Sequence, residues 1–203
     1  LKADLEKGIH TEESAMELLL EFFLSFNKDS DLYVGVQQGD NGQSMVLGGY
    51  DKDGKCVDTS MGLTPLEGLV MGTRSGDIDA GAVTFIMDKL NLDTKGISDL
   101  LNKKSGLAGV SGISNDFRDI LAGINEGNER ARIAKEMYTY RIKKYIGEYA
   151  AAMGGVDVIL FTGGAGENQW DVRQEATEGL EFMGVKVDIE KNKACRATEA
   201  VIS

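Results

Sequence analysis

The sequence predicts an α/β or α+β fold in which a mixed sheet is flanked by helices. Strand-like segments gather in the first third of the chain, amphipathic helices follow them, and a short β-branched segment comes after the longest of these helices. The chain has 203 residues, of which 42% are hydrophobic, so it can bury one good core or a core with a small appendage. We therefore expect one dominant globular domain.

The first predicted elements are a helix and a three-stranded meander. Residues 11–26 carry apolar side chains at helical spacing, and Thr11 with the acids behind it has the pattern of a helix N-terminus. Residues 32–36, 44–50 and 55–59 have strand-like sequences separated by glycine-containing turns. We expect these strands to be antiparallel neighbours in one sheet.

Helices dominate the middle of the chain. They are predicted at residues 81–91, 97–103, 115–122 and 128–153, with glycine-rich turns between them. In the longest, side chains of one face recur every three or four residues: Ala134, Tyr138, Ile142, Tyr145, Tyr149 and Ala152. Gly154 and Gly155 end this helix, whose tyrosines suit core or dimer contacts better than base stacking, because basic neighbours are confined to Lys143 and Lys144.

A strand, a helix and a strand are predicted to close the chain. Residues 156–161 form a short apolar, β-branched segment, which indicates a buried parallel strand in the same sheet as the meander. Residues 168–178 suit a helix and residues 185–189 a final strand. The loop after the first of these strands is glycine-rich, and ligands favour such strand ends.

Charge and cysteine content narrow the functional classes. The net charge is −11 with 33 acidic residues, which disfavours nonspecific binding to nucleic acid or to an anionic membrane. No apolar segment reaches the roughly 20 residues that span a bilayer. The two cysteines, Cys56 and Cys195, lack metal-ligand or CxxC spacing, so we expect small buried or half-exposed thiols, no encoded metal site and a reduced, cytoplasmic setting.

A long segment without periodicity, residues 57–79, is the strongest functional signal. Loops of this length usually serve a site. This loop holds a single arginine, Arg74, among small and acidic residues. A guanidinium is planar and always charged, so it suits a phosphate or a carboxylate.

Three glycine-bearing or capping motifs could form a nucleotide site. Residues 39–42 and 162–168 offer glycine amides that can come close to phosphates, but each is also compatible with an ordinary turn. Residues 114–119 place charges beside a phenylalanine, and a simple helix N-cap would explain them equally well. Neither glycine motif is a P-loop, because no Gly-Lys-Ser/Thr follows.

Taken together, the motifs resemble the acetate kinase family, ATP-dependent kinases that phosphorylate a short carboxylate. The resemblance covers residues 39–203 and rests on VDTSMG, TPLEGL, GTRSGDID, SGISNDFRD, YRIKKYIGEYAAAMGG and FTGGAGEN. The amino-acid sequences of the TPLEGL and GTRSGDID motifs resemble those of acetate and propionate kinases more closely than those of butyrate kinases. The family shares a ribonuclease-H-like fold with sugar kinases, actin and chaperone ATPases, and it has two such domains with ATP between them. Residues 37–203 resemble its second, nucleotide-binding domain without the C-terminal segment, whereas residues 1–36 match weakly.

The resemblance implies roles for individual residues. It implies that Arg74 stabilises the transferring phosphoryl group and that Asn41 and Gly42 contact phosphate from a hairpin. It also implies nucleoside contacts from Asp116, Phe117 and Arg118, and an adenosine and phosphate loop made by Gly164, Ala165, Gly166, Glu167 and Asn168. ATP and Mg²⁺ would be the cofactors, acetate or propionate the substrate, and a homodimer the expected assembly.

Some features of the chain depart from the family. The family has a His-Leu-Gly-Asn-Gly hairpin, and this chain has Gln-Gly-Asp-Asn-Gly at residues 38–42 instead. The imidazole is therefore lost, and Asp40 brings a carboxylate close to the expected phosphate. The single histidine, His10, lies before a helix cap rather than beside a glycine loop, and the first-domain catalytic motifs are not found. An alternative function is therefore a noncatalytic domain for nucleotide binding or dimerisation.

Overall fold

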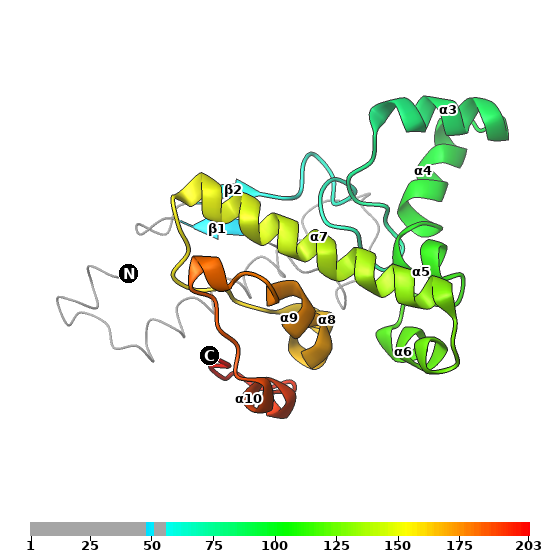
Figure 1. The fold of residues 1–203 in the computed structure, drawn as a ribbon. Coiled ribbons are helices and arrows are strands. Elements are labelled where there is room, and N and C mark those ends of the chain that lie inside the picture. Colours follow the sequence, from blue (N-terminus) through cyan, green and yellow to red (C-terminus); the bar gives the residue numbers. More distant parts are fainter. Residues whose placement is uncertain (1–47, 51–55) are drawn as a thin grey trace.

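The computed structural model describes residues 48–50 and 56–203 (Figure 1). Its elements are β1 (Gly48–Tyr50), β2 (Cys56–Thr59), α3 (Ala80–Leu90), α4 (Thr94–Lys103), α5 (Gly106–Ser111), α6 (Phe117–Asn125), α7 (Glu129–Met153), α8 (Gly163–Asn168), α9 (Trp170–Thr177), the 3₁₀ helix η1 (Glu181–Met183) and α10 (Ile189–Ala194). The helix predicted at 11–26, the strand at 32–36 and the proposed segment 1–36 lie outside the described residues.

The longest helix, α7, is the centre of the fold. It begins at an Asn128 cap, whose side chain accepts a hydrogen bond from the amide of Ala131, and it ends at Gly154, which is left-handed with φ 75°. It contacts β1, β2, α5, α6 and α9. Figure 1 shows it running across the molecule, and the prediction of a helix over 128–153 is confirmed to within one residue.

The core forms where neighbouring elements pack on the buried face of α7. That face carries Ala134, Tyr138, Ile142, Ile146 and Tyr149. Against it lie side chains from the loop after β2, from α5, α6 and α9, and from the turn before η1, namely Leu69, Val70, Leu107, Phe117, Ile120, Val172, Ala176 and Leu180. Tyr138, Tyr145 and Tyr149, the tyrosines of the predicted apolar face, are therefore core residues.

The only sheet in the described part of the chain is the antiparallel pair of β1 and β2. Gly48 lies opposite Thr59 and Gly49 opposite Asp58, and an irregularity follows before Tyr50 pairs with Cys56. The ends of two predicted strands, 44–50 and 55–59, are thus confirmed as neighbours. A larger mixed sheet of ribonuclease-H type stays a prediction.

Two other predicted strands are wrong. Residues 156–161 form no ladder with any described residue, and Val158 is 68% exposed, so this segment is not the buried strand that its apolar sequence indicated. Residues 185–188 are irregular and Ile189 begins α10. The reason is Asp188, whose carboxylate accepts hydrogen bonds of 3.0 Å from the amides of Glu190 and Lys191 and so starts a helix.

The helices between Asp79 and Ala194 differ in detail from expectation. Helices α3, α4, α6 and α9 confirm predicted helices with shifted ends. Helix α5, however, was expected to be a glycine-rich turn, and the predicted TGGAGEN loop is the short helix α8. Gly163 permits this helix because it adopts φ 71° at the first helical position.

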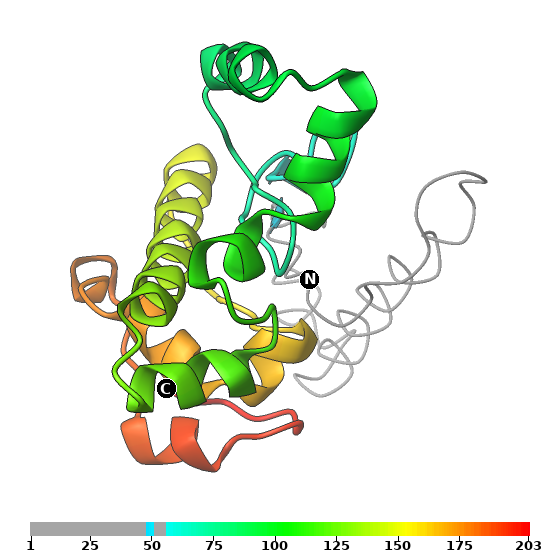
Figure 2. The same cartoon turned by 90° about the vertical axis from the view of Figure 1, so that its right-hand side faces the viewer.

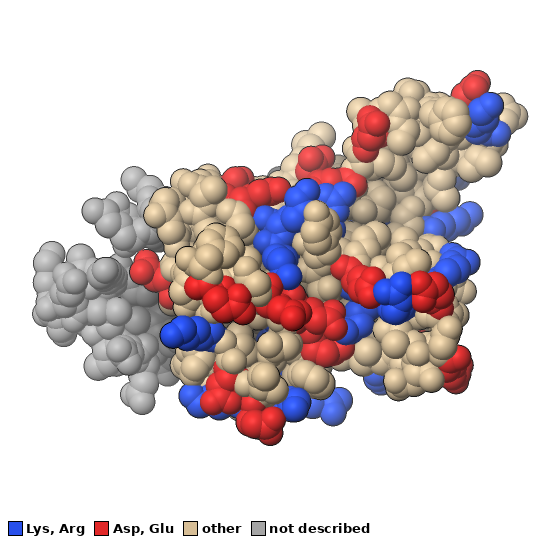
Figure 3. Space-filling view, viewed as in Figure 1, with Lys and Arg blue, Asp and Glu red and all other residues tan. Residues whose placement is uncertain are grey.

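Figures 2 and 3 show how the outer helices are placed and how charged side chains are distributed on one face. In Figure 2, α3 and α4 extend away from the body at the top, while α6, α8 and α10 gather at the opposite end. In Figure 3, acidic and basic side chains alternate over the face that is drawn, and a group of basic side chains lies over the middle of α7. Within the described residues, no helix combines the length and the apolar character needed to cross a membrane.

Candidate functional site

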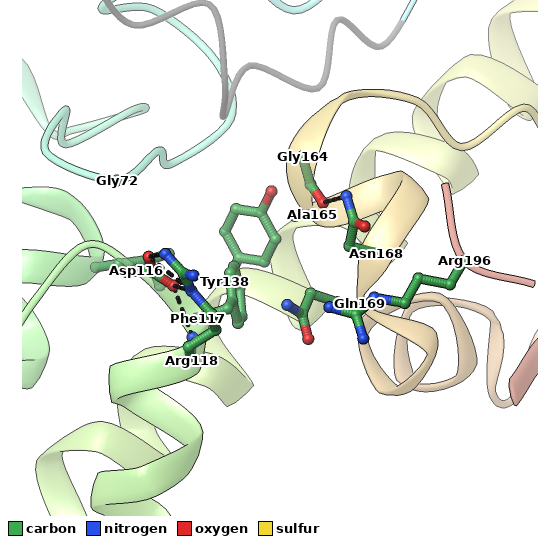
Figure 4. A pocket seen from close by; sticks show the side chains of 11 residues that line it. Gly72, Asp116, Phe117, Arg118, Tyr138, Gly164, Ala165, Asn168, Gln169 and Arg196 are labelled. Carbon is green, nitrogen blue, oxygen red and sulfur yellow. Dashed lines mark hydrogen bonds and ion pairs between the residues drawn. The ribbon is translucent and has the colours of Figure 1, made fainter. Parts of the chain in front are cut away.

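A cavity of about 310 Å³ lies where six segments that are separate in sequence come together (Figure 4). This volume is at the lower end of the range typical of small-molecule sites. The cavity is lined by Gly72, Leu107, Asp116, Phe117, Arg118, Tyr138, Gly164, Ala165, Asn168, Gln169 and Arg196. Two predicted motifs, at the starts of α6 and α8, therefore line one cavity.

The start of α6 contributes a charged pair. Asp116 caps this helix by accepting a hydrogen bond of 2.8 Å from the amide of Arg118. The Arg118 side chain returns to the same carboxylate, with Nη2 2.6 Å from Oδ2. Hydrogen bonding to Arg118 lowers the pKa of Asp116 below its ordinary value of 3.8, so this carboxylate is charged at neutral pH. The Arg118 side chain is 81% exposed, which leaves it accessible to a ligand.

Two aromatic rings form an apolar wall of the cavity. Phe117 and Tyr138 meet edge to face, with ring centroids 5.2 Å apart and planes at 64°. Both rings are buried, and burial raises the pKa of Tyr138, which stays neutral. In Figure 4 the Tyr138 ring lies between the Asp116–Arg118 pair and the α8 residues. This wall suits a flat, largely apolar group.

Helix α8 forms the opposite side. The Asn168 side-chain amide donates a hydrogen bond of 3.0 Å to the Gly164 carbonyl, which holds the two ends of this short helix together. Gly164, Ala165 and Asn168 line the cavity, whereas Gly166 and Glu167 do not. The Gly166 carbonyl instead accepts a hydrogen bond from Arg173, and the Glu167 carbonyl accepts one from the amide of Ala197.

Sequence reasoning missed several lining residues. Gln169 and Arg196 are polar, and in Figure 4 the Arg196 side chain extends toward Gln169. Arg196 is a second cation at the cavity, supplied by the segment after α10. Its only sequence signal was a basic residue in a short C-terminal stretch. Gly72 and Leu107 lie in segments with no recognisable ligand motif.

Arg74 is not among the residues that line the cavity. The loop from Ser60 to Asp79 contains neither helix nor strand, as the sequence predicted. Within it the amide of Met71 donates to the Arg74 carbonyl over 3.1 Å, closing a tight turn, and the next residue of that turn, Gly72, reaches the cavity edge. The half-buried Arg74 side chain lies 3.6 Å from the Met71 sulfur.

Two other expectations concern phosphate and metal. Asn41 and Gly42, the expected phosphate hairpin, lie outside the described residues. Across residues 48–50 and 56–203, no group of three or more His, Cys, Asp or Glu side chains has the arrangement of a metal site. The described part of the site thus offers guanidinium, amide and carboxylate groups around an aromatic wall.

Known proteins with similar sequences and structures are acyl kinases. Residues 26–203 match the acetokinase family. The acetate kinase of Phocaeicola vulgatus is 70% identical over 152 residues, 75% of this chain and 38% of that protein, and the acetate kinase of Bacteroides thetaiotaomicron is 59% identical over 181 residues, 89% and 44% respectively. The chain therefore spans less than half the length of the curated relatives that it matches.

Solved structures agree with the sequence comparison. The crystal structure of Porphyromonas gingivalis acetate kinase superposes with a TM-score of 0.74 at 48% identity, covering 88% of this chain and 46% of that one. A propionate kinase from Francisella tularensis gives a TM-score of 0.67 at 36% identity, covering 84% and 45%. Both similarities extend over most of the described residues.

Proposed function

The chain belongs to the acetokinase family, and we propose that it supplies the nucleotide-binding half of an enzyme that transfers the γ-phosphoryl group of ATP to acetate or propionate. The observation that carries this proposal is the shared cavity, which joins the start of α6 to the start of α8. The named relatives support the reaction class, since they are acetate and propionate kinases.

The chemistry of the cavity suits a nucleoside with attached phosphates. An adenine ring is flat and could lie against the wall formed by Phe117 and Tyr138. The Asp116 carboxylate can accept hydrogen bonds from ribose hydroxyls, while Arg118 and Arg196 can neutralise phosphate charge. In Figure 4, Arg118 and Arg196 lie on opposite sides of the cavity, so together they would restrict the orientations that a nucleotide can adopt.

Arg74 would act on the transferring group. Phosphoryl transfer depends on positioning and on neutralising charge on the equatorial oxygens, and a guanidinium does both. Its loop reaches the cavity edge at Gly72, two residues away, which supports a γ-phosphate close to Arg74 when the nucleoside occupies the cavity. Mg²⁺ would be held mainly by phosphate oxygens and water, as it commonly is in such enzymes.

A noncatalytic role in nucleotide binding or dimerisation is the second candidate. The altered hairpin favours it, because Gln38 and Asp40 replace the imidazole and add a negative charge where phosphate is expected. The two candidates share the nucleotide cavity and differ in whether acyl phosphate is formed. We also propose a homodimer in the cytoplasm. Sedimentation of a monomer at micromolar concentration would contradict the dimer.

Calorimetric titration tests the proposed function. Wild-type chain is titrated with ATP and with ADP, each with and without Mg²⁺, beside Arg196→Ala and the matched control Arg132→Ala, whose guanidinium is engaged by Glu129 and Glu136 on α7. Loss of a cation that pairs with phosphate should weaken ATP binding by about tenfold in Arg196→Ala. The control should bind as the wild type does. Absence of ATP binding to wild-type chain would refute the proposal.

A further inference from the structure

The loop that carries Arg74 is fixed on one side by the junction of α4 and α5. The amide of Leu107 donates to the Met71 carbonyl, and that of Ala108 to the Gly72 carbonyl, both over 2.9 Å. In the opposite direction, the amide of Ser75 donates to the Leu101 carbonyl over 2.9 Å. The turn that presents Arg74 is thus held by backbone groups on its α4–α5 side.

On its other side the loop is closed by Asp77. Asp77 and Gly68 form two hydrogen bonds with each other. The Asp77 amide donates to the Gly68 carbonyl, and the Gly68 amide donates to Asp77 Oδ1, each over 2.8 Å. Glycine is required at Gly76, where φ is 68° and a β-carbon would lie 2.6 Å from the Gly68 carbonyl oxygen. Gly68 and Asp77, which lie on the two sides of the Arg74 turn, are therefore in close contact.

The second oxygen of Asp77 faces α7. The Tyr145 hydroxyl donates to Asp77 Oδ2 over 2.5 Å, and Arg141 Nη1 lies 3.5 Å from the same oxygen. Arg141 Nη2 also donates to the Asp77 carbonyl over 3.4 Å. Tyr145 is only 8% exposed, so its hydroxyl has a defined position on the helix. A charged acceptor makes such hydrogen bonds stronger than neutral ones.

We propose that Asp77, held by Tyr145 and Arg141 of α7, is a positioning residue that sets the place of the Arg74 guanidinium. Asp77 follows Arg74 by three residues in the same loop, so we expect its displacement to move the arginine. A shift of about 1 Å in a positioned group can cost a hundredfold in rate. The role in catalysis rests on the proposed function of Arg74, whereas the coupling of Asp77 to the loop can be measured without it.

The test uses Tyr145→Phe and Asp77→Ala, with Tyr140→Phe as the matched control, because Tyr140 lies on the same helix and is 61% exposed. The full chain is treated with phenylglyoxal, which modifies accessible guanidinium groups, and the rate at Arg74 is read by mass spectrometry. The exposed Arg118 and the buried Arg173 serve as references in the same sample.

Opening of the loop should raise the modification rate of Arg74 at least about threefold in Tyr145→Phe and more in Asp77→Ala. Rates at Arg118 and Arg173 should stay at their wild-type values, and Tyr140→Phe should match wild type at all three sites. Unchanged rates at Arg74, or a parallel rise at Arg173 that reports general unfolding, would overturn the proposal. If Asp77→Ala does not fold, Tyr145→Phe still decides, since it keeps the Asp77–Gly68 hydrogen bonds.

Nucleotide affinity gives a second readout. Displacement of Arg74 should weaken the binding of ATP several-fold in Tyr145→Phe and leave the affinity for ADP within about twofold of wild type, because only ATP carries the γ-phosphate. A purely structural defect would weaken the binding of both nucleotides equally and would count against a positioning role for Asp77. If wild-type chain binds neither nucleotide, the proposed function fails, and the reactivity of Arg74 alone decides the role of Asp77.

Discussion

Arg173 and Asn192 are joined by two hydrogen bonds of 2.7 Å in the interior of the C-terminal region, from Nε to the side-chain oxygen and from Nη2 to the carbonyl. Arg173 also donates to the carbonyls of Gly166 and Cys195, each over 2.7 Å. One buried guanidinium thereby links α8, α9 and α10 and the segment that carries Arg196. Burial lowers the pKa of Arg173, but an arginine remains charged at physiological pH.

Arg173→Met should destabilise the chain by about 3 kcal/mol or more, because it removes the hydrogen bonds that the guanidinium donates to buried and part-buried oxygen atoms. Denaturant unfolding followed by circular dichroism measures this. Arg118→Met is the matched control, since its side chain is largely exposed. Equal stability of the two variants would show that the guanidinium does not hold these segments together.

A second buried cation, Lys135 of α7, predicts another loss of stability. It pairs with Glu175 and lies 3.0 Å from Asp171, both on α9. Burial alone would lower the pKa of Lys135, but its hydrogen bonds to Glu175 and Asp171 outweigh burial and leave the pKa raised.

Lys135→Met should therefore lower the free energy of unfolding by about 3 kcal/mol, since it leaves the carboxylate of Asp171 largely buried and uncompensated. The exposed Lys144, two to three turns further along α7, provides Lys144→Met as the control. A loss in Lys135→Met no larger than in this control would contradict the assignment.

The Asp116–Arg118 pair predicts a pH dependence. Because the folded-state pKa of Asp116 is lowered from 3.8, its contribution to stability is present above that pH and is lost as the pH falls through the folded-state value. A carboxyl NMR titration should give a midpoint below 3.8 in the wild type. Replacing the partner in Arg118→Gln should move this midpoint upward, and an unmoved midpoint would rule out Arg118 as the main cause.

The isolated chain should have little or no acyl kinase activity, even if it binds ATP. In-line placement of the acceptor carboxylate can account for about 7 to 11 kcal/mol of barrier reduction, and Arg74 provides only one side of that placement. A hydroxamate assay with ATP, Mg²⁺ and acetate, beside Arg74→Ala, measures it. Robust turnover that disappears in Arg74→Ala would show instead that this chain, or a partner copy of it, completes the site.

The elements that could be predicted correctly from the sequence are those whose boundaries and apolar repeat are encoded by nearby residues. Asn128 and Gly154 mark the two ends of α7, and the apolar repeat between them needs no distant partner to be recognised. The segment at 156–161 shows the opposite case. Its apolar residues suggested a strand, but a strand depends on a hydrogen-bonding neighbour, and none of the described residues provides one.

The candidate site shows the same division. Asp116, Phe117 and Arg118 were found because a cap and its following residues form a readable local motif. Arg196 was missed because tertiary contacts bring it to the cavity, namely the hydrogen bonds from Arg173 to the Cys195 carbonyl and from the Ala197 amide to the Glu167 carbonyl. The strand predicted at 185–189 failed for a related reason, since the cap at Asp188 outweighed β-branched neighbours.

Tyr138 and Tyr145 lie on the same buried face of α7, two turns or about 10.5 Å apart. The first lines the cavity and the second holds Asp77. Because both tyrosines lie on one helix, the number of residues between them determines their separation. Inserting a single residue between them would rotate one ring by about 100° relative to the other. Evolution can therefore exchange side chains within this two-turn interval far more freely than it can change the interval's length.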